Sequence, residues 1–317
     1  MRITTKLKER FCKDCNIPIN IFQEPYFTDR LKLYDEYYGT IDKWNTFVNE
    51  LNKYKTEQDY FEEYNRVKDE AINAIKSSEA YEMFQEEDMN QYAITYKNLP
   101  GKDIYHPINA EKSFISIDMK HANFSSLQHY GNIMSKSMFS GASTWEEFIG
   151  LFTNNKHIIN SKYIRQVILG NCNPKRHITY EKYLMNLTLD CLINGEAIFS
   201  LDRVVFFSND EIIIDVTDLN DFEQIAMWHC INKFASKQIL PLKAELFILC
   251  KIDGTDGYYK WIYEEGFNKI KFKCLDSLYM PFVIRHFKGE EVTEFDKVFY
   301  HNGLLAKFIE EPHIKTN

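Results

Sequence analysis

Three acidic side chains stand at places where carboxylates can act together. Asp118 ends the short apolar run Phe114-Ile115-Ser116-Ile117, which is typical of a strand. Asp210 and Glu211 lie in a hairpin-type turn between two further apolar runs. Hard cations such as Mg²⁺ (or Mn²⁺) prefer carboxylate oxygens, with water and substrate phosphates completing the coordination. Two such ions about 3.5–4 Å apart can activate an attacking hydroxyl and stabilise a leaving pyrophosphate.

The elements around these acids decide whether they meet. From residue 114 to 251 the patterns predict a β-α-β-β-α-β order with a helical insertion at about 122–200. We therefore expect a ferredoxin-like (split βαβ) antiparallel sheet. In such a sheet the end of strand one lies beside the tip of the strand two–three hairpin, so Asp118 would meet Asp210 and Glu211. The alternative is that Asp210 only forms a turn and Asp118 only ends a strand.

The same patterns divide the chain into a helical region, residues 1–110, and an α+β domain, residues 111–317. The expected helices are 40–53, 58–76, one that starts at 122, one that opens with a capping box at Thr144, 161–169, 179–194 and 221–237. The expected strands are 114–118, 203–207, 211–216, 243–251, 258–263, 269–275 and 282–287. No strand pattern is visible before about residue 112.

A polar, basic segment lies between the acids. Arg165 precedes an Asn-Pro break, and Lys175 and Arg176 follow it, so a loop could turn these cations towards one site. Arg is suited to a bidentate clamp on phosphate oxygens, and Tyr180 could stack on a base. Lys120, two residues after Asp118, is expected to add to the same nucleotide-binding pocket. The alternative is a solvated helix face followed by a polar loop.

Two of these segments resemble motifs of the family A (DNA polymerase I-like) polymerases. Phe114-Ile115-Ser116-Ile117-Asp118 is similar to their motif A, in which apolar residues and a Ser precede the metal-binding Asp. Asn209-Asp210-Glu211-Ile212-Ile213-Ile214-Asp215-Val216 is similar to their motif C, which reads His-Asp-Glu followed by apolar residues, an acid and Val. The resemblance implies a palm domain with nucleotidyltransferase activity. It also implies that Asp118 and Asp210 are the metal ligands and that Glu211 is an accessory acid.

The resemblance covers less than half of the chain, and three features depart from the family. The family carries a Glu five residues after the motif A Asp, where it helps to exclude a ribose 2′-OH. This chain has Asn123 there, which by the resemblance would lie in the nucleotide-binding site. Asn209 replaces the motif C His, and the Arg-Lys-Tyr-Gly spacing of the family's fingers helix is absent. The sequence therefore leaves open a catalytically inactive palm-like or ferredoxin-like module that binds nucleic acid or a protein partner.

Composition limits how such a chain can meet its partners. The formal net charge of the 317 residues is −8. Nucleic acid and nucleoside triphosphates are therefore expected to bind through a local basic patch. No stretch has the apolar length of a membrane-spanning helix, so we expect no membrane contact and a cytoplasmic location, in the host cytoplasm if the protein is viral. The excess of Asn, Lys, Ile, Tyr and Phe is typical of AT-rich genomes, as in many phages.

Two short motifs and an aromatic stripe suggest other roles. Cys12-Lys13-Asp14-Cys15 supplies only two of the four ligands of a usual zinc site. Lys251-Ile252-Asp253-Gly254 is similar to the nucleotidylation motif of DNA and RNA ligases, although a strand end with a Gly turn explains it better. Aromatic residues in the N-terminal helices form either core or a surface for a protein partner: Tyr34, Tyr37, Tyr38, Trp44, Phe47, Tyr60, Phe61 and Tyr64.

Overall fold

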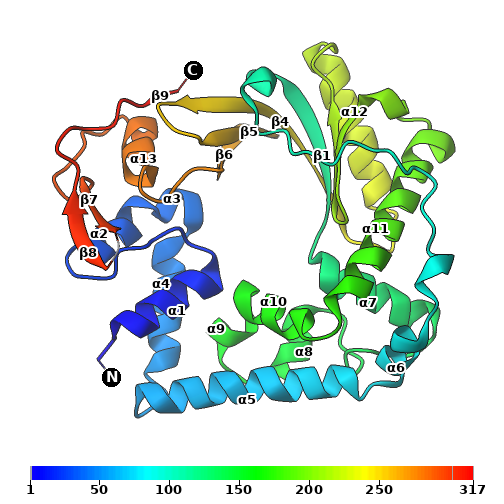
Figure 1. The fold of residues 1–317 in the computed structure, drawn as a ribbon, viewed down its shortest axis with the longest axis horizontal. Coiled ribbons are helices and arrows are strands. Elements are labelled where there is room, and N and C mark those ends of the chain that lie inside the picture. The colour runs from blue at the N-terminus through cyan, green and yellow to red at the C-terminus, as the bar shows by residue number, and fades with distance from the viewer. Residues whose placement is uncertain (1, 302, 317) are drawn as a thin grey trace.

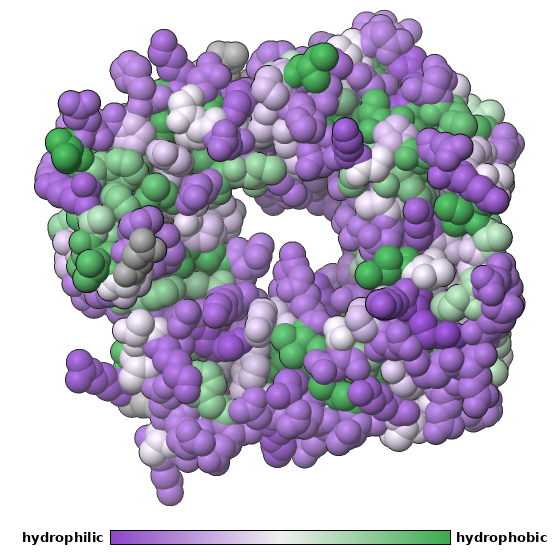
Figure 2. All heavy atoms as spheres, in the orientation of Figure 1, coloured by the Kyte–Doolittle hydropathy of each residue, from purple (hydrophilic) through white to green (hydrophobic). Residues whose placement is uncertain are grey.

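The chain forms a ring of helices and strands around a central opening. The computed structural model describes residues 2–301 and 303–316. Helices of the N-terminal region run along the lower side of the view in Figure 1, and the main sheet lies above them. Figure 2 shows that the opening passes between these parts and that hydrophilic residues surround most of it. The expected mixed α+β class is confirmed.

Six α-helices precede the first strand. They are α1 (Thr5–Cys15), α2 (Tyr26–Leu33), α3 (Asp35–Tyr38), α4 (Thr40–Leu51), α5 (Glu57–Lys76) and α6 (Glu79–Glu86). The helices predicted at 40–53 and 58–76 are confirmed as α4 and α5. A capping box opens α5, since Thr56 and Asp59 each accept a backbone N–H of the other. Within the described residues no strand precedes residue 113, as the sequence predicts.

The aromatic stripe of these helices belongs to the core. Its most buried members are Tyr34, Phe47, Tyr60 and Tyr64, and the other four rings pack against the same apolar cluster. Aromatic rings bury large areas and stabilise a core through edge-to-face contacts. Packing thus accounts for the stripe without a protein partner.

One antiparallel sheet contains the strands that carry the acids. The strands are β1 (Ser113–Met119), β2 (Val204–Phe207), β3 (Glu211–Asp215), β4 (Leu242–Asp253), β5 (Tyr258–Glu264) and β6 (Phe267–Lys273), in the order β2-β3-β1-β4-β5-β6. β9 (Lys315–Thr316) also pairs with β4, and β7 (Val298–His301) and β8 (Leu304–Lys307) form a separate hairpin. β1 therefore lies between β3 and β4, although about 90 residues separate it from β2 and β3 along the chain.

The two faces of β1 have different neighbours. Ile115, Ile117 and Met119 point into the main apolar cluster, and Phe114 belongs to a smaller cluster with Ile213 and others. Because side chains alternate along a strand, Asp118 shares the face of Phe114. Helix α12 (Asp221–Ala235) packs against β4, where the indole N–H of Trp228 donates to the Ala244 carbonyl at 3.1 Å.

The segment between β1 and β2 is helical, as predicted. It contains α7 (Ala122–Ile133), α8 (Trp145–Gly150), α9 (Lys156–Ile159), α10 (Lys162–Gly170) and α11 (Pro174–Asp190). The predicted capping box at Thr144 is present and includes Glu147. α11 begins five residues before the predicted start, because Pro174 occupies the first turn, where its missing N–H costs nothing. α10 packs against α1 and α5, so the insertion rests on the N-terminal helices.

The predicted strand at 282–287 is wrong, because this segment belongs to the helix α13 (Met280–Lys288). A short apolar run does not distinguish a strand from a buried helix by itself. The flanking residues decide for the helix: Pro281 lies in its first turn, Arg285 and Lys288 lie in its last turn, and Gly289 ends it in the left-handed region at φ 63°.

The main apolar cluster crosses the predicted domain boundary at residue 110. It contains Leu7 and Phe47 from the N-terminal helices as well as Ile115 and Ile214 from the sheet. The core is therefore continuous across residue 110. The division into residues 1–110 and 111–317 stays a prediction.

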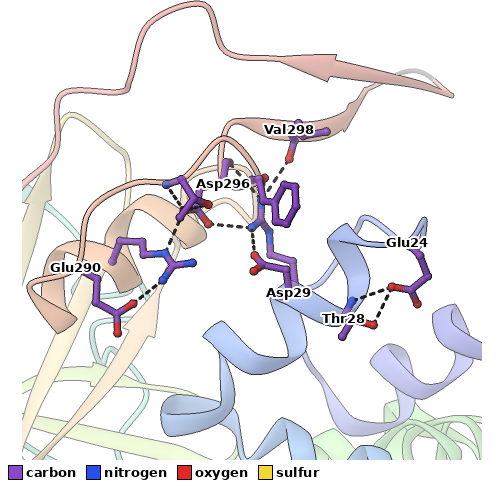
Figure 3. Close-up of polar contacts among 10 residues, drawn as sticks. Glu24, Thr28, Asp29, Glu290, Asp296 and Val298 are labelled. Atoms are coloured by element: carbon purple, nitrogen blue, oxygen red, sulfur yellow. Dashed lines mark hydrogen bonds and ion pairs between the residues drawn. The ribbon is translucent and has the colours of Figure 1, made fainter.

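A buried ion-pair network joins the first and last parts of the chain, as Figure 3 shows. Arg30 of α2 donates to the Asp296 carboxylate at 3.0 Å and to the backbone carbonyls of Phe295 and Val298 at 2.9 and 3.3 Å. Arg285 of α13 donates to the second Asp296 oxygen at 3.0 Å. We call Arg30, Arg285 and Asp296 the latch. It fixes α13 and the segment before β7 to α2, which closes the ring.

Candidate functional site

A cavity of about 930 Å³ lies where the end of β1, the β2–β3 turn, α10 and α11 meet. Asp118 and Asp210 border it from the sheet side. Lys120, Lys162 and Arg165 border it from the end of β1 and from α10. Its other lining residues include Asn123 and Glu181. We call this space the acidic cavity; five of the predicted site residues border it: Asp118, Asp210, Lys120, Asn123 and Arg165.

Asp118 lies at the end of β1, opposite Glu211 on β3 and Lys243 on β4. Directly opposed residues of an antiparallel pair have neighbouring side chains on one face. Burial, followed by the negative charges of Glu211 and Asp210, raises the pKa of Asp118 to about 6. No cation pairs with this carboxylate within the part of the chain that is described.

Asp210 is held in the β2–β3 turn by local hydrogen bonds. The Ser208 hydroxyl donates to an Asp210 carboxylate oxygen at 2.8 Å and accepts from the backbone N–H groups of Asp210 and Glu211. The Asp210 carbonyl accepts from the Met119 N–H at 2.8 Å, which ties the turn directly to the end of β1. The two acids that the sequence separates by 92 positions therefore lie at the end of β1 and in the adjoining β2–β3 turn, and both border one cavity.

Glu211 has a different environment from the two aspartates. It does not line the acidic cavity, and its carboxylate lies 3.6 Å from the Lys260 ammonium. Lys260 is buried, and its ammonium also lies 4.1 Å from the centre of the Phe247 ring. Burial lowers the pKa of Lys260, and the Glu211 charge opposes this shift. Glu211 therefore acts on the cavity through its charge.

The cationic side chains of the cavity form no ion pair among the described residues, although the charge of Glu146, which also lines the cavity, opposes the fall in the pKa of Arg165. Across residues 2–301 and 303–316, no hydrogen bond or ion pair engages the side-chain nitrogens of Lys120, Lys162 or Arg165. Arg165 is half-buried, and burial lowers its pKa. Burial and the positive charge of Arg165 also lower the pKa of the neighbouring His121. An unpaired guanidinium beside further cations forms a site suited to phosphate oxygens.

Three predicted nucleotide-binding residues do not border the acidic cavity. Lys175 is exposed at the start of α11. Arg176 donates from Nε to the Phe84 carbonyl at 2.9 Å and from Nη2 to the Glu87 carbonyl, so it fastens α11 to the end of α6. Tyr180 is 2% exposed, and its hydroxyl is 3.0 Å from His129 Nδ1. Its ring packs inside the core and presents no face to a base.

The prediction missed Glu181, an acidic residue of α11 that lines the cavity. Its carboxylate accepts a hydrogen bond of 2.6 Å from the side-chain amide of Asn209, the residue that precedes Asp210 in the sequence. Burial raises the pKa of Glu181 to about 7, and the Asp210 charge adds to the shift. His177 lies one helical turn earlier and also lines the cavity, so the i, i+4 spacing of these two residues was the signal available in the sequence.

The donor set of the cavity fits an ion that keeps several water molecules. No group of three or more His, Cys, Asp or Glu side chains among the described residues is placed to hold a metal ion. Asp118 and Asp210 supply two carboxylates that no cation neutralises. Mg²⁺ is commonly bound by one or two carboxylates together with water and substrate phosphates. These residues therefore fit Mg²⁺ or Mn²⁺, which can complete their coordination with water and phosphate oxygens. They do not fit a metal ion whose ligands all come from the protein.

The two other motifs have structural explanations. Burial raises the pKa of Cys15 to about 12, and it also raises the pKa of Cys12, so both thiols stay protonated. Lys251 donates to the carbonyls of Thr255 and Gly257, which stabilises the β4–β5 turn. Its ammonium also lies 4.6 Å from the centre of the Tyr258 ring.

Comparison with models of known protein families finds no match, and comparison with curated protein sequences finds none either. Within the described residues, no helix combines the length and the apolar character that crossing a membrane requires. The acidic cavity and its charges are therefore the features of this chain that bear on its function.

Proposed function

We propose that the chain is a palm-type nucleotidyltransferase, a minimal or divergent nucleic-acid polymerase that adds nucleotides to a 3′-hydroxyl. The strand order β2-β3-β1-β4 supports a ferredoxin-like palm, since strand one of such a sheet lies between strands three and four. Asp118 at the end of β1 and Asp210 in the β2–β3 turn occupy the two sheet positions that adjoin one another in this order.

The observation that carries the proposal is that one cavity combines carboxylates with cations. Asp118 and Asp210 border it at the edge of the sheet, and Lys120, Lys162 and Arg165, which form no ion pair among the described residues, border it together with Glu146 and Glu181. A nucleoside triphosphate bound with a divalent ion needs this combination, because the ion takes carboxylate oxygens and the phosphates take cations. The cavity volume of about 930 Å³ lies in the usual range for small-molecule sites.

Each residue then has a defined task. Asp118 and Asp210 would hold Mg²⁺ or Mn²⁺, which supplies activation of the attacking hydroxyl and neutralises charge on the leaving pyrophosphate. Arg165 binds phosphate oxygens with its planar fork, and Lys120 and Lys162 add positive charge around the triphosphate. Asn123 lines the cavity and carries no charge that would repel phosphate.

A second candidate is a catalytically inactive module that binds nucleic acid through the same cavity. The pairing of Glu211 with Lys260 favours it, because this pair withholds a third carboxylate from any metal. Both candidates predict nucleotide or nucleic-acid binding, and only the first predicts transfer.

Incorporation of labelled nucleotides tests the proposal. The purified full chain is incubated with DNA or RNA primer–templates, labelled nucleoside triphosphates, and Mg²⁺ or Mn²⁺. We expect primer extension by the wild type and, for Asp118→Asn or Asp210→Asn, only the signal seen without metal. Asp256→Asn is the matched control, since Asp256 is an exposed carboxylate in the β4–β5 turn, outside the cavity.

The nucleotide-binding half is tested with Arg165→Gln. Loss of a charge-assisted hydrogen bond is worth about 1.5–3 kcal/mol, so nucleotide affinity should fall about 10- to 100-fold. Lys175→Gln removes a nearby exposed cation that does not border the cavity, and it should leave the affinity unchanged. Absence of extension under every condition, with binding still sensitive to Arg165, would establish the inactive module instead.

A further inference from the structure

A second cavity, of about 770 Å³, adjoins the acidic cavity at α10. Its walls come from α1 and the segment 16–22 that follows it, from α3, α10 and α13, from Phe272 of β6 and the residues after that strand, and from β7. Gln166 of α10 borders both cavities, so this side chain lies between them. In Figure 1 α10 lies at the edge of the central opening, with α1 on one side and α11 on the other.

The wall of this second cavity combines aromatic rings with side-chain amides. Tyr38, Tyr163, Phe272 and Tyr300 supply rings from four different elements. Asn16, Asn20 and Gln166 supply amides, and the Gln166 amide has no hydrogen-bond partner among the described residues.

Charge is scarce in the second cavity. Lys13 and Glu9 are its only charged lining residues within the described chain, and they lie 3.5 Å from each other. The acidic cavity, in contrast, holds unpaired cations. The two cavities therefore differ in the part of a nucleotide that they can bind. The acidic cavity can bind phosphates, and the second cavity can bind bases.

We propose that the second cavity binds single-stranded nucleic acid and leads it past Gln166 into the acidic cavity. The path of the nucleic acid from the second cavity to the acidic cavity rests on the proposed function, which places the transfer reaction in the acidic cavity. Bases stack on aromatic rings whatever their sequence, and amides can hydrogen-bond their edges. Because Gln166 borders both cavities, a polymer that stacks in the second also lies next to the acidic cavity, whereas a small ligand would fill only one.

The latch contributes to this site by holding one wall of it. Met280 of α13 and Tyr300 of β7 line the second cavity, and Arg285 and Asp296 of the latch belong to the same C-terminal region. Because Arg30 fixes this region to α2, the latch helps to hold the C-terminal wall of the second cavity in place.

Fluorescence anisotropy with short labelled oligonucleotides tests the inference. The probes are single-stranded DNA, single-stranded RNA and duplex DNA of one mixed sequence. We expect the full chain to bind a single strand more tightly than the duplex, and the DNA and RNA arms show which sugar it prefers. Tyr163→Leu should weaken binding about 5- to 100-fold, because a stacked base is worth about 1–3 kcal/mol.

Two further variants separate a stacking role from a folding defect. Tyr300→Leu changes a ring that is 40% exposed and should weaken binding in the same direction without lowering the melting temperature. Phe222→Leu is the matched control, because Phe222 is 81% exposed on α12 and lines neither cavity.

Equal affinity of the wild type, Tyr163→Leu and Tyr300→Leu, or preference for the duplex, would overturn the inference. Photocrosslinking of a 5-iodouracil oligonucleotide, followed by peptide mapping, should label Tyr163 or Tyr300, and labelling confined to other peptides would also overturn it. These outcomes are independent of the proposed transfer activity, which Asp118→Asn removes without touching the second cavity.

Discussion

Asp118 and Glu211 lie directly opposite each other across the β1–β3 ladder, so two carboxylates share one face of the sheet. Like charges at opposed positions destabilise an antiparallel pair. The chain retains both, and the Lys260 ammonium lies 3.6 Å from the Glu211 carboxylate. The result is an aspartate whose pKa is raised to about 6 at the edge of a cavity that also holds unpaired cations.

Glu211→Gln should lower the pKa of Asp118. The substitution removes the largest charge contribution to the shift and leaves burial as its first cause. Carbon-13 NMR of the aspartate carboxyl groups, assigned with Asp118→Asn, measures the pKa directly. Glu291→Gln, an exposed change outside the site, should leave the titration at about 6. An unchanged or higher pKa in Glu211→Gln would show that the opposed carboxylate does not act on Asp118.

The same shift predicts how metal-dependent activity varies with pH. A raised pKa means that Asp118 takes up its proton as the pH falls through about 6, so metal binding should weaken below that pH. In Glu211→Gln the fall should move to lower pH. Binding of Mn²⁺, followed by electron paramagnetic resonance from pH 5 to 8, provides a readout that does not require transfer. A wild-type profile that is flat through pH 6 would count against this assignment.

Glu181→Gln should stabilise the chain in alkaline buffer and have little effect in acidic buffer. The pKa of Glu181 rises from 4.5 to about 7 on folding, so the native state binds the proton more tightly and stability falls as the pH rises from about 4.5 to 7. Glutamine mimics the protonated form, and its oxygen can still accept from Asn209. We expect a gain on the order of 2 kcal/mol at pH 8, since one pKa unit is about 1.4 kcal/mol.

Thermal unfolding of wild type and Glu181→Gln at pH 5 and pH 8 measures this difference. Glu86→Gln, an exposed change on α6, serves as the control and should not alter the melting temperature at either pH. An equal shift at both pH values would mean that packing, and not the titration of Glu181, causes the effect.

Asp296→Asn should loosen the ring by weakening the latch. The substitution leaves Arg30 and Arg285 without their shared counter-charge, and breaking a buried pair typically costs about 3–5 kcal/mol. We expect a lower melting temperature and faster amide hydrogen exchange in α13 and α2. Glu294→Gln is the matched control, because Glu294 lies two residues away and makes only exposed ion pairs with Lys297 and Lys307. Similar exchange in the two variants would argue that the latch does not hold the ring.

Tyr180→Phe should reduce stability without changing nucleotide binding. The hydroxyl that it removes hydrogen-bonds His129, and such a bond contributes about 1 kcal/mol to stability. Isothermal titration with a nucleoside triphosphate and Mg²⁺ should give the wild-type affinity, in contrast to Arg165→Gln. A loss of affinity in Tyr180→Phe beyond its loss of stability would return this residue to the site.

Local sequence patterns were sufficient to predict most helices and strands, and to predict that Asp118 ends a strand and that Asp210 lies in a turn. The apolar run before Asp118, the turn at Asn209-Asp210 and the capping box at Thr144 each predict their element from a few neighbouring residues. These signals depend on side-chain alternation, turn geometry and caps, which act over one to four positions. Once the order of elements was read, the meeting of β1 with the β2–β3 turn followed from the expected topology.

The orientation of α11 depended on the tertiary structure alone. Arg176 and Tyr180 form one stripe on this helix, and His177 and Glu181 form the next, which lies about 100° further around the axis. The first stripe packs against α6 and the core, and the second faces the acidic cavity. Which stripe borders the cavity is decided by partners about 90 positions away, such as Phe84 and Glu87, and no local pattern encodes that choice. For the same reason the latch, which joins positions 266 apart, is invisible until the chain is folded.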